Sequence, residues 1–508
     1  MNQTQRFTKY IPALFMIVSA VLGLLRFNSL QLGASYDDAH YVILAESISS
    51  GQGYQLINFP NPQIERAFPP GWPILLAPLT FFFPANYTVL KLFTLILWLA
   101  SLLLINKIFS KRIESPYLEI LFGLIALNPL LVGTSVSMMS ESAYLFFSLI
   151  GLVIFDSWSG GLEKQKYWLA FLIAAAALYS QLIRTIGVSI SIAVISYFIF
   201  TRRFRETAIT LGVFAFGVLL QFWLNLRNGG SLISAGYESQ VFNGSVSEKV
   251  WQMWMNLFGY LNETVTGSLV PVFGEKITGI VGPFIPLLIN VIILILILIG
   301  WMLSRKKIHL MDVYVLIYLV GILAFWNPKV GSVKARFLIP MIPFLYFYFV
   351  QGLKWILVRF TKNNLTTSAR LVFLLTGLIA LLLLARNIQD WRNPVSGQMT
   401  DLSIGADWVA ENAPADAIIM VNEPVPVYVQ LRRQTVGYPK DLQNIEKYLV
   451  NQGIDYIIIS PKLQSPRSTK LDGDVEAQLM PILNGDPGKF TVVYHNAEYN
   501  VTVFQFGN

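Results

Sequence analysis

Hydrophobic residues fall in long uninterrupted runs along most of the chain. A helix needs roughly 20 apolar residues to cross the hydrocarbon core of a bilayer, which is about 30 Å thick. Runs close to this length lie at 10–28, 87–107, 117–137, 140–157, 167–183, 186–201, 207–226, 278–303, 310–327, 337–353 and 369–386. The pattern therefore predicts a polytopic α-helical membrane protein with about eleven transmembrane helices.

Composition excludes several classes of protein. Of the 508 residues, 54% are hydrophobic and 13% are charged, whereas soluble domains average about 25% charged residues. These charges are too few to cover a surface exposed to water, which excludes a soluble enzyme, a disordered chain and a fibrous repeat. The chain contains no cysteine, so disulfides, thiol nucleophiles and cysteine-ligated metals are excluded as well.

Basic residues are concentrated in alternate loops, as they are in the cytoplasmic loops of membrane proteins. The basic groups are Arg6/Lys9, Lys107/Lys111/Arg112, Lys164/Lys166, Arg202/Arg203/Arg205, Arg305/Lys306/Lys307 and Lys354/Arg359/Lys362/Arg370. This distribution predicts a multi-pass protein with its N-terminus in the cytoplasm. We expect the membrane to be the plasma (inner) membrane. After eleven spans, the C-terminus lies on the exoplasmic or periplasmic side.

The expected organisation is a transmembrane domain, 1–386, followed by a soluble exoplasmic α/β domain, 387–508. The first exoplasmic loop, 29–86, contains segment 71–83, whose 13 residues are too few to span a bilayer unaided. We expect this segment and a helix near 38–49 to lie at the outer membrane face. The fourth exoplasmic loop is 227–277. Its Gly/Ser-rich part, 228–247, has the composition of a substrate-dependent lid or of a plain connector.

In the soluble part, helical and extended patterns alternate, which is typical of a small α/β domain. The expected elements are a helix from Asp401, strands at 417–421 and 454–459 with a helix at 440–451 between them, and strands near 490–494 and 499–506.

Acidic side chains on the expected exoplasmic face are the first candidates for chemistry. Asp37 and Asp38 follow the first span directly, with His40 beside them, and Glu141 is the acid at the turn between the third and fourth spans. Charges at the membrane surface are costly and mark functional sites by default. Helix capping is the structural alternative for all three acids, and it is favoured for the Asp pair considered alone.

Cations on the same face violate the positive-inside pattern. Arg184 lies between the fifth and sixth spans, and Lys334 and Arg336 precede the tenth. A guanidinium can bind a phosphate through two parallel hydrogen bonds, although Arg184 could instead snorkel to the interface. Acids that activate a hydroxyl, together with cations that bind a phosphate, suit transfer from a lipid-linked phosphate.

Four segments resemble those of GT-C-fold glycosyltransferases, in particular the protein O-mannosyltransferase and aminoarabinose-transferase group. The segments, in the order found in that group, are Asp37-Asp38-Ala39-His40-Tyr41, Phe68-Pro69-Pro70-Gly71-Trp72-Pro73, Ser140-Glu141 and Arg336-Phe337-Leu338-Ile339-Pro340-Met341-Ile342-Pro343. The resemblance implies transfer of a hexose or pentose from a polyprenyl-phosphate donor, with inversion, to a hydroxyl of a glycan, lipid or protein. No nucleic-acid partner is expected.

Carried over residue by residue, the resemblance assigns the catalytic base to Asp37, with Asp38 and Glu141 as catalytic partners. Substrate contacts fall on Arg184, Arg336, Lys334, Arg66 and Tyr41. An assisting divalent cation, Mg²⁺ or Mn²⁺, is compatible with the resemblance, and its candidate ligands are Asp38, Glu141 and His40. One departure concerns Arg66: several relatives have an acidic-basic pair directly before Pro-Pro, where this chain has Ala67-Phe68.

Two other functions predict different patterns. A lipid-linked-glycan transporter or flippase would have facing charges at the bundle midplane and readable repeats. An O-antigen ligase or polymerase would have its chemistry in a large late exoplasmic loop, and the Asp pair in the first loop argues against it.

Overall fold

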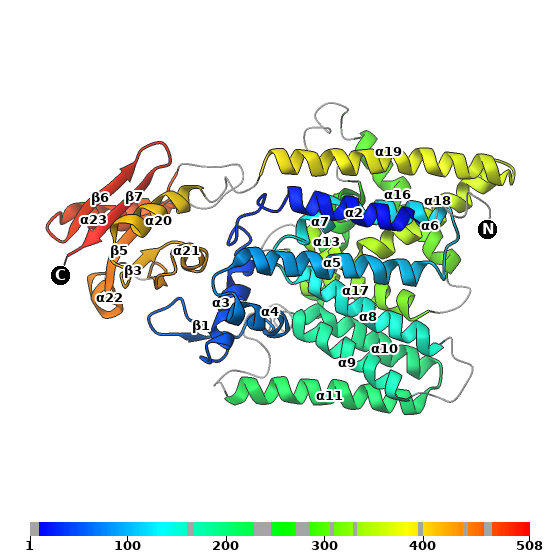
Figure 1. The fold of residues 1–508 in the computed structure, drawn as a ribbon, viewed down its shortest axis with the longest axis horizontal. Coiled ribbons are helices and arrows are strands. Elements are labelled where there is room, and N and C mark those ends of the chain that lie inside the picture. Colours follow the sequence, from blue (N-terminus) through cyan, green and yellow to red (C-terminus); the bar gives the residue numbers. More distant parts are fainter. Residues whose placement is uncertain are drawn as a thin grey trace.

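The computed structural model describes residues 10–159, 167–227, 245–270, 282, 284–304, 309–328, 333–394, 400–439, 442, 445–461 and 470–507. Of the expected lid, 228–244 lies outside the described residues, as do parts of loop 227–277. Roughly parallel helices form a bundle, and a mixed sheet with its helices lies at one end of the longest axis (Figure 1). The N- and C-termini lie at opposite ends of this axis.

Helices occupy all eleven expected spans. They are α2 (Ile11–Leu25), α5 (Tyr87–Phe109), α6 (Tyr117–Ala126) with α7 (Pro129–Thr134), α8 (Glu141–Ser159), α9 (Tyr167–Ile183), η1 (Thr185–Gly187) with α10 (Val188–Phe200), α11 (Phe204–Arg227), α16 (Phe284–Ser304), α17 (Leu310–Phe325), η3 (Ala335–Met341) with α18 (Ile342–Phe360), and α19 (Leu365–Arg392). Within the described ranges, six helices are long and apolar enough to cross a membrane. Five of the expected spans contain shorter apolar helices, so a multi-pass membrane fold is clear and the count of eleven crossings stays a prediction.

The first loop is folded against the bundle. It contains α3 (Asp37–Ser49), the two-stranded ribbon β1 (Gln55–Leu56) and β2 (Gln63–Ile64), and α4 (Gly71–Phe82). The first residue of α4 is Gly71, where a larger residue would not fit. A Cβ at this position would lie 2.6 Å from the backbone of Leu182 at the end of α9. This close approach joins the first loop to the end of the bundle that carries Arg184.

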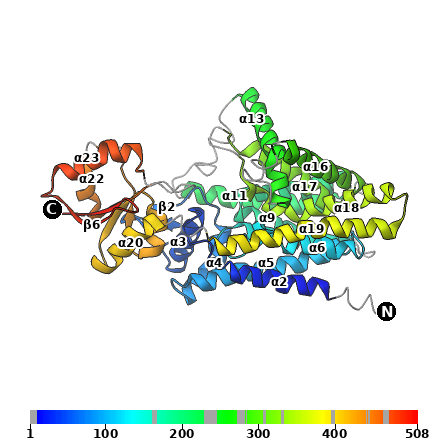
Figure 2. The same cartoon turned by 90° about the horizontal axis from the view of Figure 1, so that it is seen from above.

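The fourth loop contains α13 (Val246–Gly259), η2 (Tyr260–Thr264) and α14 (Val265–Leu269). A capping box formed by Ser245 and Glu248 starts α13. This helix lies on the opposite side of the bundle from α2 (Figure 2). The amide groups of Gln252 and Asn256 donate to the backbone oxygen of Trp326, which follows α17.

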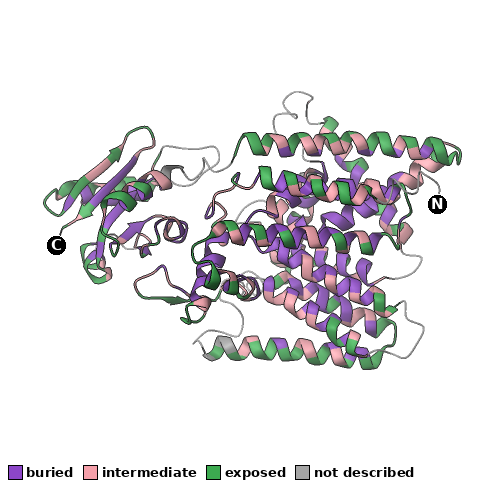
Figure 3. Ribbon diagram, in the orientation of Figure 1, coloured by how far each residue is buried: buried purple, intermediate pink, exposed green. Residues whose placement is uncertain are grey.

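Burial follows the position of each helix in the bundle. Helices α8 and α18 are mostly buried, whereas α11 and α19 at its edges are largely exposed (Figure 3). Apolar side chains such as Phe216, Leu219 and Leu381 point outward. An apolar surface of this extent is what a lipid environment covers.

The C-terminal part is built on a five-stranded sheet with strand order β4-β3-β5-β7-β6. Its elements are α20 (Thr400–Asn412), β3 (Ile418–Val421), α21 (Pro424–Leu431), β4 (Thr435–Val436), α22 (Ile445–Gln452), β5 (Ile454–Ile459), η5 (Val475–Leu479), α23 (Met480–Gly485), β6 (Phe490–Asn496) and β7 (Val501–Phe506). Alternate residues of β3 face opposite sides: Ile419 packs in the cluster with α20, and Met420 packs in the cluster with α22. The division at residue 387 remains a prediction.

Helix α21 connects this sheet to the first loop. Val425 and Val429 belong to the main apolar cluster of the bundle. The Arg432 guanidinium contacts the buried Glu46 carboxylate of α3 at 2.8 Å. Helix α3 is thereby held at one end by the C-terminal part, while its other end carries Asp37.

Membrane orientation can be tested by proteolysis. The distribution of basic loops predicts that residues after about 387 lie outside the cell and loop 201–206 lies inside. Protease added to intact cells or right-side-out vesicles is expected to cleave the C-terminal part and to spare loop 201–206. Cleavage of the loop with protection of the C-terminal part would contradict the predicted orientation.

Candidate active site

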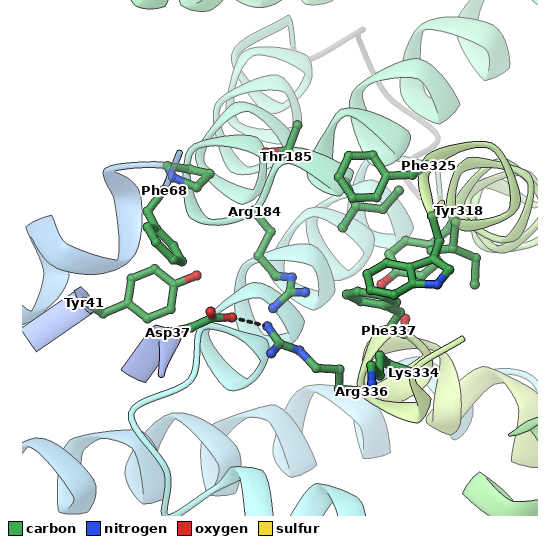
Figure 4. Close-up of a pocket in the computed structure, with 14 residues that line it drawn as sticks. Asp37, Tyr41, Phe68, Arg184, Thr185, Tyr318, Phe325, Lys334, Arg336 and Phe337 are labelled. Carbon is green, nitrogen blue, oxygen red and sulfur yellow. Dashed lines mark hydrogen bonds and ion pairs between the residues drawn. The ribbon is translucent and has the colours of Figure 1, made fainter. Parts of the chain in front are cut away.

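A cavity of about 370 Å³ lies at the end of the bundle nearest the first loop. Asp37, Tyr41, Arg184 and Arg336 line its polar side, and Figure 4 shows Asp37 beside Tyr41 and facing Arg336. The remaining lining residues are Phe68, Pro69, Thr185, Ile186, Tyr318, Ile322, Phe325, Trp326, Lys334 and Phe337. The structure thus brings five of the predicted site residues to one cavity, from segments almost 300 residues apart in the chain.

Four charged side chains form a continuous chain of ion pairs at this cavity. Arg336 Nη2 lies 2.6 Å from Asp37 Oδ2, and Arg336 Nε lies 3.2 Å from Glu141 Oε1. Arg184 Nη1 lies 2.6 Å from the same Glu141 oxygen. Arg184 and Arg336 therefore share the buried Glu141 carboxylate. Arg336 also contacts Asp37, which is the carboxylate of this series that lines the cavity.

Local structure explains how each group reaches this point. Asp37 begins α3, directly after Tyr36, whose φ of 61° is unusual for a non-glycine residue. Glu141 begins α8, and Arg184 immediately precedes η1. Arg336 is the second residue of η3. All four charges therefore lie at or next to an element terminus, where the backbone changes direction and a side chain can project into the space between helices.

Burial divides the four charges into an inner and an outer pair. The Glu141 and Arg184 side chains are 1% and 11% exposed, whereas Asp37 and Arg336 are 26% and 34% exposed. A buried charge is stable only when it is paired, so the buried Glu141 carboxylate needs its ion pairs with the two arginines. These ion pairs hold the guanidinium groups in position. Arg336 and Asp37 form the accessible pair, which an entering anion can reach.

Neutral hydroxyl groups complete the polar wall. Arg184 Nη1 donates to Ser140 Oγ at 3.0 Å, and the hydroxyl groups of Ser140 and Tyr41 lie 3.2 Å apart. Burial raises the pKa of Tyr41 well above its ordinary range, so the phenol keeps its proton at neutral pH. It can donate a hydrogen bond next to Asp37.

Asp38 does not line the cavity. Its carboxylate accepts hydrogen bonds from the backbone N–H groups of Gly33 and Ala39, both at 3.0 Å. Burial raises its pKa to about 6. In this position the side chain fixes the turn that leads into α3.

His40 and Arg66 also lie outside the cavity lining. The His40 ring packs between the rings of Tyr36 and Phe68, with centroid distances of 4.7 and 4.8 Å, and burial lowers its pKa. The Arg66 side chain is exposed on the first loop. Its neighbour Glu65 accepts hydrogen bonds from the backbone N–H groups of Arg66 and Phe68, which shapes the turn into Pro69.

The carboxylates at this site are paired with arginines. Arg336 contacts both Asp37 and Glu141. Among the residues that the structure describes, no three His, Cys, Asp or Glu side chains converge as metal ligands. Asp38, His40 and Glu141, the ligands expected from sequence, are not brought together.

The sequence analysis did not identify the apolar wall of the cavity. Tyr318, Ile322 and Phe325 lie on one face of α17, and the Tyr318 hydroxyl donates to the Phe337 backbone oxygen at 2.7 Å. Their spacing of four and three residues repeats with the period of a helix, which is the signal that could have identified this wall. It offers an apolar surface directly opposite the arginines.

No protein-family model matches the chain, and no curated protein matches it in sequence. Solved structures do match its fold. ArnT from Cupriavidus metallidurans bound to undecaprenyl phosphate is 13% identical, has a TM-score of 0.63 and aligns over 97% of both chains. The oligosaccharyltransferase AglB from Archaeoglobus fulgidus, in complex with an inhibitory peptide and a dolichol-phosphate, is 12% identical with a TM-score of 0.55, over 89% of this chain and 70% of that one.

A structure of the Archaeoglobus fulgidus oligosaccharyltransferase in complex with Zn and sulfate gives a TM-score of 0.57 at 12% identity, over 97% of this chain and 73% of that one. The three alignments cover 89–97% of this chain. The fold expected from the four sequence segments is therefore confirmed: the chain has the GT-C fold.

Proposed function

We propose that the protein is a membrane glycosyltransferase that moves a sugar from a polyprenyl-phosphate donor to an acceptor hydroxyl. The observation that carries the proposal is the accessible Asp37–Arg336 ion pair at the cavity wall, which Arg336 joins to the buried Glu141–Arg184 pair behind it. Likeness in fold to enzymes crystallised with undecaprenyl phosphate and with dolichol-phosphate supports the donor class.

The donor phosphate is proposed to bind Arg336 and Arg184, with Lys334 at the rim. A phosphate oxygen would take the place of the Asp37 carboxylate on Arg336, because both anions seek the same guanidinium. The apolar wall formed by Tyr318, Ile322 and Phe325 would cover the first isoprene units. Binding of the donor thereby releases Asp37 from its ion pair at the moment when a base is needed.

In the transfer step, Asp37 takes the proton of the acceptor hydroxyl while the oxygen of that hydroxyl attacks the anomeric carbon of the sugar. The bond between that carbon and the phosphate oxygen breaks, and polyprenyl phosphate leaves with both electrons of the bond. Arg184 and Arg336 stabilise the charge that develops on the leaving phosphate. Attack from the face opposite the phosphate inverts the anomeric centre.

The proposed step does not pass through a metal ion. The guanidinium of Arg336 supplies the positive charge between the two carboxylates, and both arginines line the cavity in which the phosphate is proposed to bind. The acceptor class, whether glycan, lipid or protein, and the size of the sugar are left open by this geometry.

The function can be tested with the purified protein and a polyprenyl-phosphate sugar labelled in the sugar. In the presence of a membrane extract that supplies acceptors, we expect label to move to a new product and polyprenyl phosphate to be released in equal amount. Movement of intact donor across a vesicle bilayer without cleavage would favour a flippase and contradict the proposal.

A further inference from the structure

A second cavity, of about 640 Å³, lies at the opposite end of the bundle. Helix α8 runs between the two cavities, with Glu141 at one end and Asp156 near the other, about 22 Å apart along the helix axis. The second cavity is lined by Lys111, Arg112, Asp156, Ser159, Leu303, Ser304, His309, Met311, Asp312, Phe347 and Gln351. These residues come from the segment that follows α5, from the ends of α8 and α16, from the start of α17 with the preceding His309, and from α18; Figure 1 shows these helices in the bundle. None of the residues takes part in the proposed transfer.

Asp312 is the unusual residue of this cavity. It is only 7% exposed, and its Oδ1 accepts hydrogen bonds from the hydroxyl groups of Tyr348 at 2.6 Å and Ser304 at 3.1 Å. Within the part of the chain that the structure describes, its second oxygen, Oδ2, is buried and accepts no hydrogen bond. A buried carboxylate oxygen left in this state is costly, so a ligand that donates a hydrogen bond to it would be stabilised.

The other buried charges of the cavity satisfy one another. Arg112 and Asp156 form a two-pronged ion pair in which Nη1 and Nη2 each lie 2.7 Å from a carboxylate oxygen. This geometry is the strong, planar form of the Arg–carboxylate pair. Arg112 is therefore committed to Asp156, and Asp312 has no cation of its own within the described part of the cavity.

A ligand for this cavity must carry a positively charged group that donates a hydrogen bond to Asp312, and it must also contact apolar surface. Lys111 is exposed at the rim and can bind an anion, while Leu303, Met311 and Phe347 form apolar surface beside Asp312. A zwitterionic head group with a primary ammonium and a phosphate carries both charges. Phospholipid head groups lie at this level, where transmembrane helices end.

We propose that this cavity binds the head group of a phospholipid with a primary ammonium, of the phosphatidylethanolamine type. The ammonium donates to Asp312 Oδ2, the phosphate lies against Lys111, and the acyl chains follow the apolar surface of α16. The site is independent of the proposed transfer reaction.

Lipid binding can be measured by native mass spectrometry of the full chain released from detergent. We expect phosphatidylethanolamine to remain bound at least about tenfold more tightly than phosphatidylcholine of the same acyl chains. The three methyl groups of choline remove the N–H donors, so phosphatidylcholine cannot form the charge-assisted hydrogen bond to Asp312. Equal retention of the two lipids overturns the proposal, and this comparison needs no variant.

A matched pair of variants locates the site. Asp312→Asn keeps the size of the side chain but removes its charge, and we expect it to abolish the preference for the primary ammonium. Glu114→Gln is the control, because Glu114 lies at the same end of the bundle, pairs with Lys354 and is 74% exposed. A preference that survives in Asp312→Asn overturns the assignment of Asp312. Binding of free phosphoethanolamine as tightly as the lipid overturns the lipid as ligand.

Discussion

Replacing Asp37 with asparagine is expected to lower the turnover of sugar transfer by about 10²–10⁴-fold, the range typical of losing a general base. Asparagine keeps the size of the side chain but cannot accept the proton of the acceptor hydroxyl. Donor binding should not weaken and should tighten, because the substitution frees Arg336 from its 2.6 Å ion pair with the Asp37 carboxylate. Turnover and donor affinity, measured on the same purified variant, separate the two effects.

The split between turnover and affinity distinguishes a base from a merely structural acid. Loss of folding would lower both quantities, and loss of a phosphate-positioning group would lower affinity. Transfer at the wild-type rate by Asp37→Asn would remove Asp37 from the reaction.

Asp38→Asn is the matched control for this experiment. Asp38 is adjacent in sequence and also begins α3, but its carboxylate bonds to backbone amides and lies outside the cavity lining. We expect this variant to retain turnover within about tenfold of wild type, below the range typical of losing a general base. An inactive Asp38→Asn beside an active Asp37→Asn would exchange the roles of the two residues.

Asp38 should also leave a signature in the pH dependence of stability. Because burial raises its pKa from 3.8 to about 6, the folded protein holds this proton more tightly than the unfolded chain. The free energy of unfolding therefore falls as pH rises from about 4 to 6 and stays lower above this range. The asparagine variant has no proton to lose, so its unfolding curve should lack this decline.

Hydrophobic runs were sufficient to place the helices but not their interruptions. The run 117–137 was expected to be one span, and the structure divides it into α6 and α7. Pro129 has no N–H to continue the helix, and the Asn128 side chain accepts hydrogen bonds from the N–H groups of Leu130 and Leu131. Asn128 also donates to Tyr346 across the bundle, a tertiary contact that hydropathy does not encode.

The signs of the site charges could be predicted from sequence, but their pairing could not. Positive and negative residues on one membrane face were identified separately, whereas the structure shows that Arg336 bridges Asp37 and Glu141. Neighbours in sequence were expected to act together, as Asp37 and Asp38 were. In a helix, however, consecutive side chains point about 100° apart, and only one of these two faces the cavity.

Contacts between distant parts of the chain could not be predicted from the sequence either. The Arg432–Glu46 pair joins α21 to α3 across almost 400 residues, and neither residue carries a local pattern that identifies its partner. Pairs of this kind depend on how the C-terminal part packs against the first loop. Glu46 follows the apolar stretch Val42–Ala45 in α3, and an acid that becomes buried requires a partner, but this pattern does not say which residue the partner is.

Arg336→Ala is expected to weaken binding of the polyprenyl-phosphate donor by roughly 30-fold or more, because it removes the hydrogen bonds from the guanidinium to the phosphate, and a hydrogen bond to a charged group contributes about 1.5–3 kcal/mol. Folding should suffer less, since Glu141 keeps its ion pair with Arg184 and Asp37 is partly exposed.

Lys334→Ala is the matched control: this cation lies at the exposed rim of the same cavity, where screening limits its contribution to about 1 kcal/mol or a few-fold in affinity. Arg336→Lys keeps the charge but loses the planar fork that contacts two carboxylates at once, so it should recover only part of the affinity. Donor dissociation constants for the three variants, with thermal unfolding midpoints beside them, test this order. Equal affinities for Arg336→Ala and wild type would show that the phosphate binds elsewhere, and the release of Asp37 by the donor would then have no basis.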